Sequence, residues 1–193
     1  MKIYSIGADY KACKTFTLPM SDVLLAYKNQ IPMKQLLDFP KHNLALTDVW
    51  KRMEASFESI SDITQSETIP DITTWVTGTL VLSEKAKQLL TCLEGHGEYL
   101  PINTPDGEYW IFNCLEVLPA DENQSKRTVE QGQVLDVEKI EFSEDVVKNT
   151  CIFKTDYDGF RSTFCSGTLR EEISKNQLRG LTFNTNLINP NYV

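Results

Sequence analysis

The chain has 193 residues, of which 41% are hydrophobic, and this supply is sufficient for a globular core. Its formal net charge of −8 argues against a nucleic-acid partner, because binding phosphates requires a basic surface. The first residues lack a signal-peptide pattern, and no apolar run reaches the ~18 residues of a membrane-spanning helix. We therefore expect a cytoplasmic protein with no membrane partner.

The charge is distributed unevenly along the chain. Residues 1–52 are net positive by four, whereas residues 53–71 contain five acidic side chains and no basic one. Such a stretch attracts a partner protein with a basic surface, although a solvated loop has the same composition. The acidic residues of the stretch are Glu54, Glu58, Asp62, Glu67 and Asp71.

The N-terminal portion, residues 1–68, is predicted to be irregular. Residues 2–6 form a plausible edge strand, and Ser21 is placed to cap a short helix over residues 21–28. Residues before proline avoid helical geometry, so Leu18, Ile31 and Phe39 mark breaks. The polar composition of residues 56–72 predicts a connecting loop or flap.

The pattern is clearer after residue 72. Residues 76–82 are rich in β-branched side chains and predict a strand or an extended entry segment, after which Ser83 is placed to cap a helix. Apolar residues then fall at helical spacing, and Gly95 can end that helix in a left-handed conformation. The stripe consists of Ala86, Leu89, Leu90 and Leu93.

Residues 98–102 and 108–117 predict an antiparallel hairpin. Pro105 presets the turn between them and Gly107 accepts positive φ, which places Asp106 at the hairpin tip. The second run is apolar on both faces in its first half, so we expect a central strand covered on both sides, with Trp110 in the core.

The remaining elements complete an α+β fold, with helices packed on a largely antiparallel sheet. Residues 119–132 are predicted to be a surface loop, and residues 137–142, 151–154 and 163–165 to be strands. A capping box at Thr168 and Glu171 predicts a helix over residues 169–177, with Leu169 and Ile173 on its inner face. Gly180 and a short strand at residues 181–183 follow. We divide the chain into residues 1–68 and 69–193, leaving open whether the first part is a separate subdomain.

The sequence contains no arrangement typical of a catalytic or metal site. Phosphate-binding loops and a nucleophile elbow are absent, and His42 and His96 are the only histidines. The five cysteines are scattered without a Cys-x-x-Cys pair, which indicates reduced and mostly buried thiols. We therefore expect no catalytic residues, no metal and no cofactor.

Six phrases occur in order between residue 69 and residue 183: residues 69–72 (IPDI), 82–90 (LSEKAKQLL), 98–102 (EYLPI), 109–115 (YWIFNCL), 152–154 (IFK) and 178–183 (LRGLTF). In these phrases and their spacing, the chain resembles immunity protein family eleven of the bacterial polymorphic toxin systems. The resemblance implies a protein that binds and neutralises a toxin encoded beside it. The shared phrases occupy core and turn positions, so they imply the fold and do not identify the contact surface.

Our first hypothesis is therefore an antitoxin that occludes its cognate toxin stoichiometrically, using the five acidic residues of the stretch and Asp106. A second hypothesis is an enzyme that reverses a modification made by the toxin. A third is a non-catalytic adaptor or homo-oligomer that uses exposed aromatic residues such as Trp75 or Tyr192.

Overall fold

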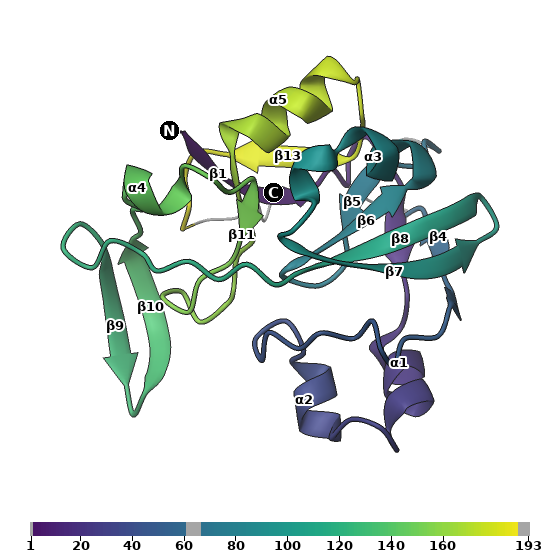
Figure 1. The fold of residues 1–193 in the computed structure, drawn as a ribbon, viewed down its shortest axis with the longest axis horizontal. Helices are drawn as coiled ribbons and strands as arrows, with labels where there is room; N and C mark the ends of the chain where they lie inside the picture. Colours follow the sequence, from purple (N-terminus) through teal and green to yellow (C-terminus); the bar gives the residue numbers. More distant parts are fainter. Residues whose placement is uncertain (1, 61–66, 189–193) are drawn as a thin grey trace.

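The computed structural model describes residues 2–60 and 67–188. About 19% of the chain is helix and 34% is strand, and most strand pairs are antiparallel, which confirms the predicted α+β class. Figure 1 shows a central sheet, a second smaller sheet and a projecting two-stranded ribbon, and a further pair of short strands completes the sheets of the described residues.

The central sheet has five strands and is built around the predicted hairpin. Its spatial order is β3 (Met53–Glu54), β7 (Gly97–Thr104), β8 (Gly107–Cys114), β6 (Thr79–Ser83) and β5 (Ile72–Thr74). The β3–β7 pair is parallel, and the other pairs are antiparallel. Thr104 pairs with Gly107, whose φ of 122° requires glycine, so the turn forms as the sequence predicts.

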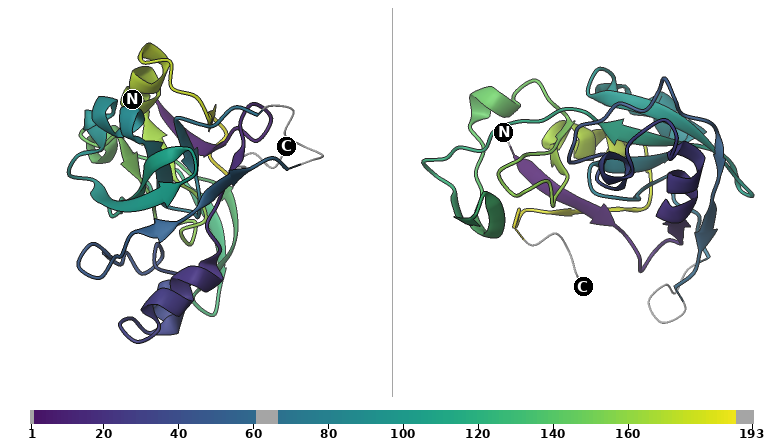
Figure 2. Two further views of the ribbon diagram at one scale, coloured as in Figure 1. Left: turned by 90° about the vertical axis from the view of Figure 1, so that its right-hand side faces the viewer. Right: turned by 90° about the horizontal axis from the view of Figure 1, so that it is seen from below.

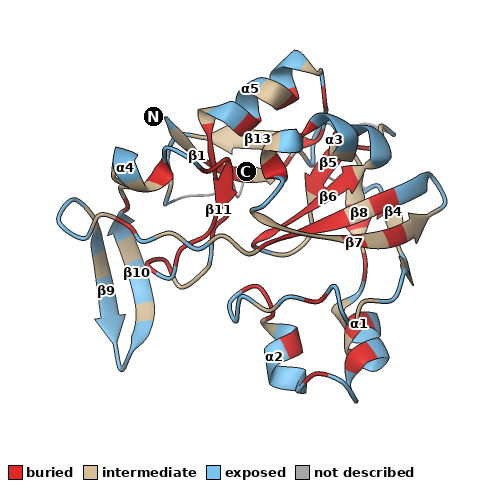
Figure 3. Ribbon diagram, in the orientation of Figure 1, coloured by how far each residue is buried: buried red, intermediate tan, exposed pale blue. Residues whose placement is uncertain are grey.

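The central strand β8 buries side chains on both of its faces, which confirms the two-sided apolar pattern. Ile111 packs into a cluster with residues of the N-terminal helices α1 (Met20–Tyr27) and α2 (Met33–Leu37). Phe112 packs on the opposite face, in a cluster that includes Leu90 and Ile173. That face is covered by α3 (Glu84–Leu89), the 3-10 helix η1 (Thr91–Leu93) and α5 (Gly167–Lys175), as Figures 1 and 3 show.

The second sheet joins the two ends of the described chain. Its order is β11 (Ile152–Phe153), β12 (Phe164–Ser166), β1 (Ile3–Ala8) and β13 (Leu181–Asn184). The prediction of an edge strand at residues 2–6 is therefore wrong, because β1 has a hydrogen-bonded neighbour on each side (Figure 2). The division at residue 68 remains a proposal. Strand β1 belongs to residues 1–68, and in this sheet it pairs with β12 and β13, which belong to residues 69–193.

Three short pieces of structure lie in segments predicted as loops or given no element. The range 119–132 contains β9 (Lys126–Glu130), which pairs with β10 (Gln133–Lys139) to form the projecting ribbon. The range 56–72 begins with β4 (Ser56–Glu58), which pairs with β2 (Thr15–Thr17). A helical turn, α4 (Glu144–Val147), precedes β11. The ribbon is mostly exposed, so it has no alternating apolar face from which a strand could be recognised.

The helix signals are accurate in type and less accurate at the helix ends. Ser83 caps α3, since its hydroxyl accepts a hydrogen bond from the Ala86 amide at 3.2 Å. The helix ends after Leu89, which is 39% exposed, whereas Leu90 is fully buried. Gly95, with φ of 84°, follows the 3-10 turn rather than the helix itself.

The other two predicted caps are wrong. Helix α1 begins at Met20 after Pro19, and Ser21 lies inside its first turn. Proline suits this place because a helix start leaves its first amides unbonded. Helix α5 begins at Gly167 after Ser166, and neither of these two helices has a side-chain hydrogen bond at its cap. The inner face of α5 is as predicted, with Leu169 and Ile173 buried.

Candidate partner-binding surface

Two of the predicted acidic residues lie on consecutive short strands at one edge of the molecule. Glu54 of β3 is exposed and accepts a hydrogen bond from the side-chain amide of Asn103 at 2.7 Å. Glu58 of β4 is exposed and accepts one from the Ser56 hydroxyl at 3.1 Å. Asp62 lies outside the described residues. Both described carboxylates thus face solvent and accept these bonds from neutral side chains.

Glu67 and Asp71 have basic neighbours within the fold. The Lys14 ammonium lies 2.5 Å from Glu67, and this contact lowers the pKa of the Glu67 carboxyl. Asp71 lies 3.4 Å from the Lys85 ammonium and accepts a hydrogen bond from the Arg179 amide at 3.0 Å. Asp71 therefore holds together the segments before β5 and before β13. The sequence could not show this, because the partners are distant along the chain.

Asp106 lies at the exposed tip of the β7–β8 hairpin, as predicted. Its own amide donates a hydrogen bond to the Thr104 hydroxyl at 3.2 Å, and that hydroxyl donates to the Gly107 carbonyl oxygen at 2.9 Å. The turn is thus held by Thr104, which leaves the Asp106 carboxylate outside these bonds.

Beside the tip, one face of the hairpin extends beyond the covering helices. Asn103, Glu108 and Trp110 project from this face, since Asn103 pairs with Glu108 and Trp110 pairs with Pro101. Strand β3 and the segment before it contribute further residues, and α3 contributes two more. We call this surface the hairpin face; it consists of Arg52, Glu54, Glu84, Lys87, Asn103, Glu108 and Trp110.

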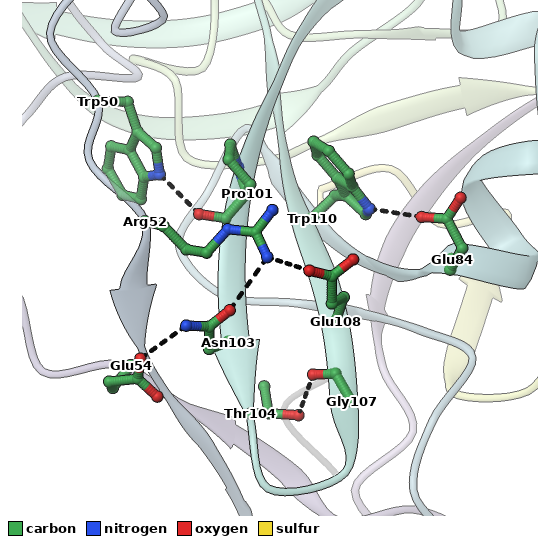
Figure 4. A network of polar contacts seen from close by, with 10 residues as sticks. All are labelled: Trp50, Arg52, Glu54, Glu84, Pro101, Asn103, Thr104, Gly107, Glu108 and Trp110. Atoms are coloured by element: carbon green, nitrogen blue, oxygen red, sulfur yellow. Dashed lines mark hydrogen bonds and ion pairs between the residues drawn. The ribbon is translucent and has the colours of Figure 1, made fainter.

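A chain of polar contacts crosses the hairpin face (Figure 4). The Arg52 guanidinium donates to the Asn103 side-chain oxygen at 3.1 Å and forms an ion pair with Glu108. Asn103 in turn donates to Glu54, so one network links β3 to both strands of the hairpin. With Asp106 at the tip, the surface carries four acidic and two basic side chains, a net charge of −2.

Trp110 is half-buried, so the prediction that it belongs to the core is wrong. Its indole Nε1 donates to Glu84 at 2.8 Å, and the Lys87 ammonium lies 3.3 Å from its ring centroid. The hydrogen bond from Trp110 lowers the pKa of the Glu84 carboxyl and is the largest contribution to that shift. The strand pattern correctly placed Trp110 on the same face as Phe112. It could not show that α3 is too short to cover both residues.

Elsewhere the surface has a hollow of about 420 Å³ between the ribbon and the loops after α2 and β11. Asp158, Arg161 and Ser162 line it. Asp158 is buried and accepts a hydrogen bond from the Arg161 amide at 3.2 Å. Burial raises the pKa of this carboxyl above its usual range. A polar hollow with a perturbed acid is the feature that the enzyme hypothesis requires.

The cysteines and His96 are further reactive groups, and most of the thiols are buried. All five cysteines are described and carry free thiols; four are buried and Cys92 is partly exposed. His96 lies 3.6 Å from Glu116 in the turn before β7. Within residues 2–60 and 67–188, no group of three or more potential ligands is arranged to hold a metal ion. In the same part of the chain, no helix is long and apolar enough to cross a membrane. Helix α5, for example, has only nine residues.

The hairpin face thus combines Trp and Arg, which are enriched at protein–protein interfaces, with Glu and, at the tip, Asp, which are depleted there. A comparison with family models identifies the family: the Immunity protein family (Imm11) matches residues 23–186. The match covers most of the chain, and the chain belongs to this family. No curated protein matches the chain.

Proposed function

We propose that the protein is an antitoxin that binds a cognate bacterial toxin and neutralises it by stoichiometric occlusion. Membership of the Immunity protein family (Imm11) over residues 23–186 is the observation that carries this proposal. The partner is then the toxin of a polymorphic toxin system, and the site of action is the cytoplasm of the cell that must be protected.

The acidic residues are proposed to steer a toxin with a basic surface and to pair with its Arg and Lys side chains. Glu54, Glu58 and Asp106 suit this role because their carboxylates are exposed. Glu67 and Asp71 would have to exchange contacts with Lys14 and Lys85 for contacts with the toxin. Asp62 completes the proposed set. The net charge of −8 supports a protein partner over nucleic acid.

A pull-down with the protein encoded by the adjoining gene tests the proposal, followed by titration of that protein's toxicity or activity. We expect a stable complex and inhibition that is complete at a fixed molar ratio. Failure of the two proteins to bind would contradict the proposal. Light scattering of the antitoxin alone shows in the same preparation whether it is a homo-oligomer, as the adaptor hypothesis requires.

A second candidate function is an enzyme that reverses the toxin's modification, and the hollow lined by Asp158 favours it. This function predicts protection by trace amounts of antitoxin and loss of that protection in Asp158→Asn. Because the Asp158 carboxylate also holds the turn at Arg161, the variant's thermal stability must be measured in parallel. Protection that scales with stoichiometry, and that survives in Asp158→Asn, would exclude this candidate.

A further inference from the structure

On the hairpin face, a cationic side chain already occupies an aromatic surface. The Lys87 ammonium lies 3.3 Å from the Trp110 ring centroid and 5.5 Å from the Tyr99 ring centroid. These distances are within the range of cation–π attraction, which is strongest for Trp. Glu84 lies at the edge of the same ring and accepts the indole hydrogen bond. Aromatic rings and a carboxylate thus form a receptor for a positive charge.

The ammonium in this receptor belongs to a partly exposed side chain. Lys87 is on the short helix α3. A lysine ammonium is a mobile point charge on a flexible stem. A guanidinium can stack flat on an indole and bind a carboxylate with two parallel hydrogen bonds, which an ammonium cannot do. An arginine can therefore make contacts with Trp110 and its neighbouring carboxylates that Lys87 cannot make.

We propose that the hairpin face receives a cationic segment of the cognate toxin, and that an arginine of that segment displaces Lys87 and stacks on Trp110 beside Glu84 and Glu108. This inference rests on the proposed function and specifies its contact surface. The complementarity is electrostatic, since the surface carries a net charge of −2 with Asp106 included. Trp110 is the proposed anchor, because Trp is enriched among the few residues that contribute most of the binding energy at interfaces.

The proposal also assigns a role to the network around Arg52. Its guanidinium is held by Asn103 and Glu108, so it orders Glu108 in the free protein. Toxin binding would share Glu108 between Arg52 and the incoming arginine. The surface is thus preorganised for its partner, which lowers the entropic cost of binding.

The test measures the Kd of the purified antitoxin for the protein encoded by the adjoining gene, using calorimetry at low salt. We expect Trp110→Ala to weaken binding by about tenfold or more, as an anchor residue should. Glu108→Gln should weaken it less. Lys87→Met should tighten binding, because it removes the internal competitor and one positive charge. The matched control is Glu171→Gln with Glu172→Gln on α5, which should leave Kd unchanged.

The outcomes separate this inference from the function on which it rests. No binding by the wild-type protein would refute the proposed function itself. Binding by the wild type that is equally tight in Trp110→Ala and Glu108→Gln would overturn the hairpin face and leave the antitoxin function standing. If Trp110→Ala fails to fold, tighter binding by Lys87→Met would support the proposal, and unchanged or weaker binding by that variant would overturn it. If the wild-type protein self-associates and Trp110→Ala abolishes this, the proposal is overturned and the hairpin face binds a second copy of the chain instead.

Discussion

The buried ammonium of Lys154 donates a hydrogen bond to the carbonyl oxygen of Pro40 at 2.6 Å. Lys154 is fully buried, and burial lowers its pKa to about 8 from a usual value of 10.5. The bond ties the segment after β11 to the loop after α2, so a single lysine connects the N-terminal helices with the second sheet. A buried lysine of this kind makes the stability of the protein depend on pH.

Because the pKa of Lys154 is lower in the folded state, the unfolded chain binds more protons between pH 8 and pH 10.5. The free-energy cost of burying the Lys154 charge therefore applies in full below about pH 8 and declines as the pH rises. Relative to Lys154→Met, the wild type should gain about 2–3 kcal/mol of unfolding free energy between roughly pH 7.5 and pH 10. Urea unfolding of both proteins measures this. If the difference in unfolding free energy between the two proteins does not change with pH, the Lys154 ammonium is hydrated in the folded protein.

Adjacent leucines at the end of α3 should respond very differently to truncation. Leu90 is fully buried in the cluster around Phe112, whereas Leu89 is 39% exposed. Leu90→Ala should cost about 2–5 kcal/mol of unfolding free energy through lost burial and a cavity. Leu89→Ala, its matched control, should cost less than about 1 kcal/mol. Similar losses at the two positions would contradict the difference in burial between Leu89 and Leu90.

Two glycines with positive φ provide a comparison between backbone strain and steric conflict. Gly95 has φ of 84°, and a methyl group added there would meet open space, so Gly95→Ala should cost about 1–2 kcal/mol. At Gly180, with φ of 118°, a Cβ atom would lie 2.3 Å from the Ile72 carbonyl oxygen. Gly180→Ala should therefore cost about 3 kcal/mol or more, since the clash adds to the strain. Thermal unfolding followed by calorimetry gives both values. Equal melting temperatures would contradict the close approach of Gly180 to the strand β5.

Charge reversal at the acidic edge should slow association with the toxin. Glu54→Lys with Glu58→Lys should lower the association rate constant by about tenfold at low salt, because both carboxylates contribute to steering. The difference should shrink at high salt, where these charges are screened. Stopped-flow mixing at two salt concentrations measures it, with Glu171→Lys plus Glu172→Lys as a control of equal charge change. An association rate that the first pair leaves unchanged at low salt would remove Glu54 and Glu58 from the encounter surface.

Local features are predictable from the sequence because they depend on neighbouring residues. Gly107 in the hairpin turn, Ser83 at the start of α3, and the inner face of α5 at Leu169 all follow from backbone geometry and spacing. The position of Asp106 at the hairpin tip follows for the same reason.

Features that depend on distant contacts are not predictable in this way. The sequence could not place β1 inside a sheet, since its neighbours β12 and β13 come much later in the chain. It could not show that Asp71 is held by Lys85 and the Arg179 amide. The pattern assigns Trp110 to the core because an apolar strand residue is usually covered, whereas the covering helix is too short to reach it fully.

The central place of β1 in the second sheet has a consequence for synthesis of the protein. Ile3 pairs with Ser166, and Ser5 pairs with Asn184. During translation, the first strand leaves the ribosome long before either of its neighbours has been made. Its edges must therefore stay unpaired until nearly the whole chain has emerged, and closing such a long loop is a slow step. The nascent protein should thus depend on chaperones, or on rapid completion, to avoid pairing with other chains.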